Sequence, residues 1–313
     1  MQRRRSNTRS TPSRTITTRA AHPHEWQLET ADGRRLRIEV AGDCRRVVVV
    51  QVGSPNAGVL DDRWVEDAAV RGLTLITYDR PGYGESSPQP GRLVADCAAD
   101  VRTISEAVGF ERCVVWGFSG GGPHALACGA LLDDLVMAVA TIGSPAPFDA
   151  SGFDYFAGMS DTAVDDIALF LSDRAEWERS GEAQRDALLV LNADELVQQW
   201  SAGASPADAV VLRSDFGAWL YRSLQAALAP GVAGWMDDDV AVFHTPWGFE
   251  PGSISTAVKV WHSLDDRFVP FGHGRWLADT IPGAQAALRD DDGHLTVVAQ
   301  RIGDVHEWLA QYI

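Results

Sequence analysis

The sequence has no uninterrupted apolar run of about 18 residues, the length that a helix needs to cross a bilayer. Positive charge is also scarce: 27 Lys and Arg face 43 Asp and Glu, for a net charge of −16 at pH 7. A chain this acidic is poorly suited to bind nucleic acid or an anionic membrane surface. We attribute the acidity to solubility and expect a small-molecule substrate, no nucleic acid or membrane partner, and a monomer or homodimer.

Cysteine is rare, and its spacing does not resemble that of a metal site. Cys44, Cys97, Cys113 and Cys128 are scattered along the chain, three of them in apolar segments. This favours buried thiols in a reducing compartment, and so a cytoplasmic protein. No convincing cluster of His, Cys and Asp is present, so we expect no metal and chemistry without a cofactor.

The first 24 residues contain six arginines, many Ser and Thr, and no acidic residue. They lack the apolar segment of a secretory signal. Their composition resembles that of an organelle transit peptide, but no amphipathic apolar face is evident. We interpret this segment as a disordered basic tail or as an over-long predicted start.

Residues 25–147 alternate between strand-like and helix-like patterns. A hairpin over 25–41 is followed by expected strands at 46–52, 73–78, 113–116 and 135–142, with helices at 60–72, 93–108 and 123–131. The strands are continuous apolar runs, as is typical of strands buried on both faces. The pattern predicts an α/β fold with a mostly parallel, doubly wound central sheet.

The alternation stops over residues 148–252, which we interpret as a helical cap inserted into a core of residues 25–147 and 253–313. Helices are expected at 162–171, 183–200 and 216–228, and the insertion contains five tryptophans. The core resumes with expected strands at 255–261 and 285–288 and helices at 274–281 and 296–313. Most of the tryptophans are expected to pack the cap on the core, and some to line an apolar pocket.

A glycine-rich corner joins the strand at 113–116 to the helix that follows it. Ser119 has Gly117 and Gly121 two positions away on either side, the pattern of a nucleophile elbow. At such a corner the serine adopts a strained backbone conformation, and larger side chains at the two glycines would collide with neighbouring backbone. The N–H of Gly120 lies at the start of a helix, where negative charge is favoured. The pattern predicts an exposed, nucleophilic hydroxyl on Ser119.

Serine needs a base, and the base needs a group that orients it. His294 follows the last expected strand, and Asp266 follows the strand before it. Both therefore lie beyond the carboxyl ends of strands, where open α/β sheets place their sites. The order Ser, Asp, His along the chain is the one expected for this elbow.

These residues and the motifs around them resemble the α/β-hydrolase superfamily over residues 25–313. Beside the elbow, HSLDDRFVP at 262–270 is similar to the family's acid loop, and GHL at 293–295 to its histidine loop. DRPGYGES at 79–86 is similar to its DRPGxGxS turn, and VGSPN at 52–56 resembles its oxyanion loop. The resemblance identifies an esterase-like member with a serine nucleophile and a cap.

The resemblance implies roles for individual residues. Ser119 would be the nucleophile, His294 the base and Asp266 the acid that orients it. The N–H groups of Ser54 and Gly120 would form the oxyanion hole. One departure is that Val52 stands where the family usually has a histidine in the oxyanion loop, which leaves the identity of the donors open. Asn56 could add a side-chain donor, although a plain turn residue is the better interpretation.

A second candidate for the acid and several further histidines lie near these motifs. Asp265 is the other candidate for the acid, and alignment to the acid loop favours Asp266. His124 and His262 are interpreted as structural residues, and His244 and His273 as surface or pocket-lining residues.

The resulting prediction is a serine hydrolase of small to medium apolar esters, thioesters or lactones. An aminopeptidase of the proline iminopeptidase type is an alternative, in which an acidic residue of the insertion such as Glu250 would bind a substrate ammonium. That group usually has Trp after the serine, whereas this chain has Gly120. A non-catalytic ligand-binding member of the fold is a further alternative.

Two other activities are disfavoured. Residues 120–125 formally match a dinucleotide-binding fingerprint, but the proline within it and the missing ribose-binding acid argue against a nicotinamide cofactor. Relatives that open epoxides or cleave carbon–halogen bonds have Asp at the position of Ser119.

Overall fold

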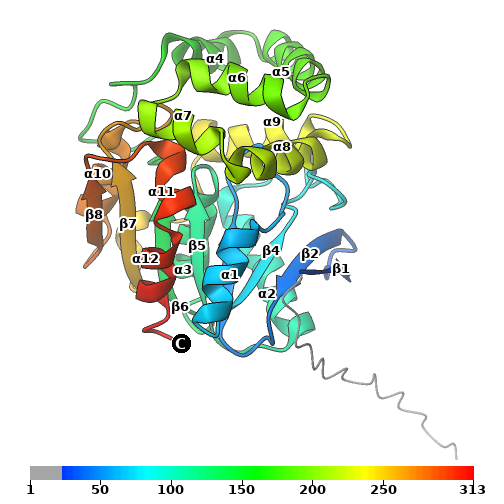
Figure 1. The fold of residues 1–313 in the computed structure, drawn as a ribbon, viewed down its shortest axis with the longest axis vertical. Coiled ribbons are helices and arrows are strands. Elements are labelled where there is room, and N and C mark those ends of the chain that lie inside the picture. Colours follow the sequence, from blue (N-terminus) through cyan, green and yellow to red (C-terminus); the bar gives the residue numbers. More distant parts are fainter. Residues whose placement is uncertain (1–22) are drawn as a thin grey trace, which may run out of the picture.

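The computed structural model describes residues 23–313, and its centre is an eight-stranded sheet with the order β1-β2-β4-β3-β5-β6-β7-β8 (Figure 1). The strands are β1 (His24–Glu29), β2 (Arg35–Ala41), β3 (Val47–Gln51), β4 (Thr74–Tyr78), β5 (Cys113–Phe118), β6 (Val136–Ile142), β7 (Ala257–Ser263) and β8 (Gln285–Arg289). β1 and β2 form the expected antiparallel hairpin, and β2 is antiparallel to β4. From β4 to β8 every neighbouring pair is parallel, which confirms the predicted fold class.

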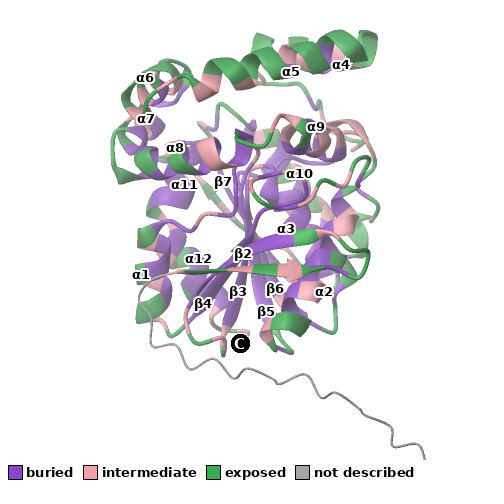
Figure 2. Cartoon of the chain, turned by 90° about the vertical axis from the view of Figure 1, so that its right-hand side faces the viewer, coloured by how far each residue is buried: buried purple, intermediate pink, exposed green. Residues whose placement is uncertain are grey.

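Helices cover both faces of the sheet. On one face lie α1 (Asp62–Val70), α11 (His294–Gln300) and α12 (Ile302–Leu309), and on the other α2 (Cys97–Val108), α3 (Gly121–Leu131) and α10 (Phe271–Thr280). The four valines of β3 show why: Val47 and Val49 belong to the core on one face, and Val48 and Val50 to the core on the other. All four are fully buried, and Figure 2 shows the central strands β3 to β6 in the purple of buried residues. The β-branched run therefore has no solvent face.

Six α-helices are inserted between β6 and β7 and lie over the carboxyl ends of the strands; we call this segment the cap (Figure 1). They are α4 (Asp161–Ser172), α5 (Arg174–Leu189), α6 (Ala193–Gly203), α7 (Pro206–Leu212), α8 (Asp215–Leu228) and α9 (Ala233–Asp239), with a π-helical turn at Val240–His244. α4 and α5 lie furthest from the sheet in Figures 1 and 2.

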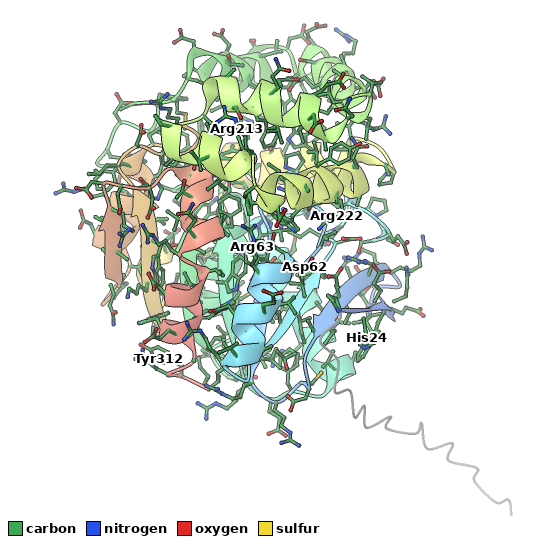
Figure 3. The ribbon with its side chains drawn as sticks, viewed as in Figure 1. His24, Asp62, Arg63, Arg213, Arg222 and Tyr312 are labelled. Carbon is green, nitrogen blue, oxygen red and sulfur yellow. The ribbon has the colours of Figure 1, made fainter. Side chains whose placement is uncertain are left out.

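Helix α8 ties the cap to the core. Its Trp219 is fully buried, packs 4.7 Å from the ring of Trp64 in α1, and donates a hydrogen bond to the carbonyl of Val59. Arg63, at the start of α1, lies at the end of that helix nearest α8 (Figure 3). Its guanidinium is 5.4 Å from the ring of Phe216 in α8. The tryptophan of this helix therefore serves the packing of cap on core, as expected for most of the five.

Two expected helices are broken in the structure. The helix predicted at 183–200 is wrong as a single element, because α5 ends at Leu189 and α6 begins with Asn192 as its N-cap. The asparagine side chain accepts from the N–H of Glu195, and the glutamate side chain bonds back to the N–H of Asn192. This reciprocal capping starts a new helix. The closing helix is also two helices, with α11 starting at His294 and α12 at Ile302.

The basic tail predicted over residues 1–24 lies outside the described residues up to residue 22, and β1 begins at His24. Within residues 23–313, no helix has both the length and the apolar character required to span a bilayer. Cys97, Cys113 and Cys128 are buried, Cys44 is partly buried, and all four are free thiols.

Candidate active site

The corner between β5 and α3 has the strained geometry expected of a nucleophile elbow. Ser119 has φ of 52°, one of two non-glycine residues in the described chain with positive φ. A Cβ at Gly117 would lie 2.2 Å from the carbonyl oxygen of Gly121, and one at Gly121 would lie 2.0 Å from that of Gln51. Only glycine fits at these two positions, because β3, β5 and α3 approach backbone to backbone.

Asp266 and His294 form a direct hydrogen-bonded pair beside this corner. The Asp266 Oδ2 to His294 Nδ1 distance is 2.7 Å, and both residues are buried. The other oxygen of Asp266 accepts from the N–H groups of Phe268 at 3.0 Å and Val269 at 2.8 Å. The carboxylate is thereby held in place, and it orients the imidazole through one nitrogen.

The corner at Ser119 and this pair are in contact. The ring of Phe118, the residue before Ser119, lies 4.9 Å from the ring of His294. The ring of Phe268 also packs on the imidazole, with ring centres 5.1 Å apart. The loops after β5, β7 and β8 thus meet at one edge of the sheet, as parallel strands require.

The charges of the pair support each other. Burial alone would lower the pKa of His294, but the negative charge and hydrogen bond of Asp266, with a smaller contribution from Asp208, raise it above the usual value. Burial likewise would raise the pKa of Asp266, but the positive charge and hydrogen bond of His294 lower it. His262 also faces Asp266, at 3.5 Å. Burial lowers the pKa of His262, which favours its neutral form.

The alternative acid, Asp265, lies outside this arrangement. Its side chain is half-exposed and pairs with the exposed Arg267 at 3.2 Å. His124 and His262, interpreted as structural, are buried and hydrogen-bonded to the backbone carbonyls of Gly120 and Val269. His273, interpreted as a surface or lining residue, is also buried and accepts from the N–H of Ala146. His244, interpreted in the same way as His273, lines a cavity that is described below.

The two predicted oxyanion donors lie next to each other. A Cβ at Gly120 would be 3.3 Å from the amide nitrogen of Ser54, and one at Gly53 would be 3.1 Å from the Cβ of Ser119. Within the described chain, neither the N–H of Ser54 nor that of Gly120 donates to another backbone or side-chain group. Both amides therefore remain available beside Ser119 for a developing negative charge.

A buried charge network supports the loop predicted to hold the oxyanion, and the sequence did not indicate this network. Asp238 of α9 accepts from the hydroxyl of Ser54 at 2.5 Å, from Arg92 at 2.6 Å, from Tyr83 at 3.1 Å and from Arg80. Arg80 also donates to the carbonyl of Val52 at 2.6 Å. Burial would raise the pKa of Asp238, but the two guanidinium groups hold it well below its usual range. The Asp lies in an acidic run, Asp237–Asp239, that reads as a solvated helix end, so no sequence signal singled it out.

A cavity of about 140 Å³ lies beside the acid loop, under the cap. Its walls are mainly apolar: Pro145, Met159, Ala163, Ile167, Phe243, Phe268 and Val269, together with Asp166, Asp239 and His244. Phe268 and Val269 connect it to Asp266 and His294.

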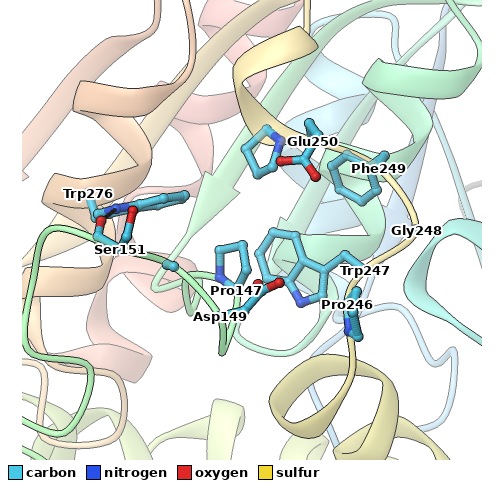
Figure 4. Close-up of a pocket in the computed structure, with 11 residues that line it drawn as sticks. Pro147, Asp149, Ser151, Pro246, Trp247, Gly248, Phe249, Glu250 and Trp276 are labelled. Carbon is cyan, nitrogen blue, oxygen red and sulfur yellow. Dashed lines mark hydrogen bonds between the residues drawn. The ribbon is translucent and has the colours of Figure 1, made fainter.

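A larger cavity of about 400 Å³ lies elsewhere, between the loop after β6 and the loop before β7 (Figure 4). It is lined by Pro147, Asp149, Trp247, Phe249, Glu250 and Trp276, among others, and by none of Ser119, Asp266 and His294. Glu250 therefore does not face the predicted nucleophile.

Residues 23–313 contain no group of three or more His, Cys, Asp or Glu side chains arranged to hold a metal ion. The segment that matches a dinucleotide fingerprint, 120–125, is fully buried, with a Cβ at Gly122 placed 2.1 Å from the hydroxyl of Ser144. No space for a phosphate exists at this close contact.

Residues 46–297 match the family described as the alpha/beta hydrolase fold. The chain belongs to this family. A curated relative, the putative carbamate hydrolase RutD of Pseudomonas savastanoi pv. phaseolicola, is 25% identical over 247 residues, which cover 74% of this chain and 81% of the relative.

Solved structures share the fold of this hydrolase-family chain. A bromoperoxidase from Bacillus anthracis is 20% identical with a TM-score of 0.67, over 92% of this chain and 99% of that one. An enol-lactonase from Burkholderia xenovorans LB400 is 17% identical with a TM-score of 0.65, over 91% of this chain and 98% of that one. An esterase from Exiguobacterium antarcticum is 20% identical with a TM-score of 0.64, over 91% and 98%. At these identities the likeness concerns the fold.

Proposed function

We propose that this hydrolase cleaves small to medium apolar esters, thioesters or lactones through an acyl-enzyme. Ser119 Oγ attacks the substrate carbonyl carbon while His294 takes the hydroxyl proton, and the carbonyl oxygen becomes an oxyanion held by the N–H groups of Ser54 and Gly120. The tetrahedral intermediate collapses, and His294 delivers the proton to the leaving alkoxide or thiolate. Water then attacks the Ser119 ester with His294 again as base, and the acid leaves as Ser119 regains its proton.

The observation that carries this proposal is the hydrogen bond of 2.7 Å between Asp266 and His294, set against an elbow serine with φ of 52°. A buried carboxylate on one imidazole nitrogen fixes the tautomer in which the other nitrogen can accept a proton. His262 instead bonds to the backbone carbonyl of Val269. A second histidine–carboxylate pair, His306 with Asp67 at 2.8 Å, joins α12 to α1 and, among the described residues, has no serine of positive φ beside it.

The cavity under the cap supports an apolar acyl or leaving group. Its aliphatic and aromatic walls suit a small hydrocarbon group, and its volume of about 140 Å³ favours a short chain. The relative named for carbamate hydrolysis and the structural neighbours named as esterase and enol-lactonase are proteins in which a related fold is associated with attack on an acyl carbon.

The aminopeptidase alternative has one supporting observation. Asp166 and Asp239 line the cavity beside Phe268, and burial raises the pKa of both carboxyls, that of Asp239 further through the charges of Asp166 and Asp238. A substrate ammonium would relieve that repulsion. Comparing aminoacyl amides with apolar esters of matched size separates the two: faster turnover of the amides would favour the aminopeptidase.

Covalent labelling by a fluorophosphonate tests the proposed nucleophile. Purified protein should be labelled with a one-to-one stoichiometry, and Ser119→Ala should abolish labelling. Ser151→Ala, which changes an exposed loop serine, serves as the matched control and should be labelled like the wild type. Folded wild-type protein that resists labelling would refute the serine-hydrolase mechanism and favour a non-catalytic ligand-binding protein.

A further inference from the structure

The cap supplies a buried carboxylate to the histidine loop of the core. Asp208 lies in α7 and is fully buried. Its carboxylate accepts hydrogen bonds from the first turn of α11, 86 to 88 residues further along the chain. Its Oδ2 accepts from the N–H of His294 at 2.8 Å. Its Oδ1 accepts from the N–H groups of Leu295 and Thr296 and from the hydroxyl of Thr296, each at 2.8 Å.

These hydrogen bonds pair the N–H groups at the start of α11, which have no partner within the helix itself. The first N–H groups of a helix have no partner within it, and that end carries partial positive charge. Gly293, the N-cap of α11, has no side chain with which to cap the helix. The carboxylate from α7 replaces this missing local cap with four hydrogen bonds.

The local sequence conceals this role. Ser205 is the N-cap of α7, and its hydroxyl accepts from the N–H of Asp208 at 3.1 Å. A Ser followed three residues later by an acid reads as the start of a helix with an acidic first turn. The backbone of Asp208 has that ordinary function, whereas its side chain faces a different part of the chain.

His294 is held at two points as a result. Asp266 binds the imidazole at Nδ1, and Asp208 binds the backbone nitrogen of the same residue. The charged and titratable groups around the imidazole are Asp266 in the loop after β7, His262 on β7, and Asp208 on α7. Asp208 is the one of these that belongs to the cap.

We propose that Asp208 is a positioning residue for His294, so that the cap completes the catalytic geometry as well as covering the pocket. This inference rests on the proposed function, because it assigns the support of the proposed base. Displacement of α7 would release the first turn of α11, and with it the imidazole. The negative charge of Asp208 also stabilises the imidazolium that forms while His294 holds the proton of Ser119.

The test compares Asp208→Asn with the wild type in the full chain. Asp215→Asn is the matched control, since it makes the same change at an exposed first-turn position of the cap helix α8. In Asp208→Asn, the second-order rate of labelling by the fluorophosphonate should fall by about 10- to 100-fold, the loss typical of a small misplacement of a catalytic group. The acid limb of the rate against pH should shift to lower pH, because the pKa of His294 loses a supporting charge. Asp215→Asn should change neither.

The outcomes separate this inference from the function on which it rests. Absence of labelling in the wild type would refute the serine-hydrolase mechanism. Labelled wild type with an Asp208→Asn variant that keeps both the wild-type rate and the wild-type pH profile would overturn the positioning role alone. A reduced labelling rate with an unchanged pH profile would also overturn the positioning role, because it would mean that Asp208 stabilises the fold without acting on His294.

A second pair of variants keeps the test decisive if Asp208→Asn fails to fold, as judged by circular dichroism. Thr296→Val removes the hydroxyl that donates to Asp208, and Thr296→Ser retains it. Labelling of Thr296→Val should be several-fold slower than that of Thr296→Ser. Equal rates in these two folded variants would contradict the positioning role.

Discussion

Replacing Asp266 by Asn tests the proposed site most sharply, because a neighbouring aspartate provides an internal control. Asp266→Asn keeps the volume of the side chain but removes its charge and places an amide where His294 Nδ1–H donates. Asp265→Asn makes the same chemical change one residue away, on a half-exposed side chain whose ion pair with Arg267 is also exposed. The two variants therefore differ mainly in the contact with His294.

The size of the effect follows from that contact. The hydrogen bond of 2.7 Å fixes the tautomer of His294, and an amide that donates to Nδ1 would leave the other nitrogen protonated and unable to accept the proton of Ser119. Loss of the tautomer in a triad lowers kcat by about 10⁴-fold, or about 5 kcal/mol of barrier. Asp265→Asn should change kcat by less than about twofold, since exposed ion pairs contribute about 0–1 kcal/mol.

The dependence on pH supplies an independent readout. His294 acts as a base only when neutral, so kcat/KM should fall as the pH drops through its pKa, which is raised by Asp266. Asp266→Asn removes that charge, so the remaining activity should lose its acid limb at a lower pH than the wild type. Ester hydrolysis followed from pH 5 to 9, together with circular dichroism to establish folding, measures both effects.

Comparable activity in wild type and Asp266→Asn, with loss in Asp265→Asn, would show that the acid is Asp265. Equal activity in all three proteins would refute the reasoning that a buried carboxylate orients the base.

Two further substitutions test the surroundings of the site. Gly143→Ala should lower kcat about 10- to 100-fold, because the new Cβ would lie 2.9 Å from His294 Nδ1 and would displace the imidazole. Gly252→Ala is the control and should leave kcat unchanged, since the nearest atom to its Cβ is 3.9 Å away. A fully active Gly143→Ala variant would mean that the pair of Asp266 and His294 tolerates displacement. Asp238→Asn should lower the free energy of unfolding in urea by about 3–5 kcal/mol at pH 7, since it leaves buried guanidinium charges uncompensated, against at most about 1 kcal/mol for the exposed Asp186→Asn. Because the pKa of Asp238 is lowered in the folded state, its contribution to stability is present above about pH 4 and is lost as the pH falls toward that pKa. The difference in free energy of unfolding between Asp238→Asn and the wild type should therefore narrow in acid. A difference below about 1 kcal/mol at pH 7 would contradict the stabilising role of the network.

The sheet could be predicted from the sequence because its pattern is local. The apolar run at 46–52 reports burial on both faces, and the Gly-rich corner at Ser119 reports a steric requirement of its own backbone. The prediction of a single helix at 183–200 is wrong, because the reciprocal cap between Asn192 and Glu195 starts a new helix within a continuous helical pattern. Apolar periodicity carries no information on such side-chain to backbone bonds.

The sequence by itself determined the α/β class, and it predicted the elbow at Ser119 with Asp266 and His294 as its partners, since each of these motifs is short and local. Only the tertiary structure showed that two aspartates of the cap, Asp208 and Asp238, hold the histidine loop and the oxyanion loop of the core. Their partners lie 86 and 184 residues away in sequence, and a carboxylate buried by such contacts has the same local pattern as one that faces water. The difference is decided by what packs against it, which no local pattern encodes.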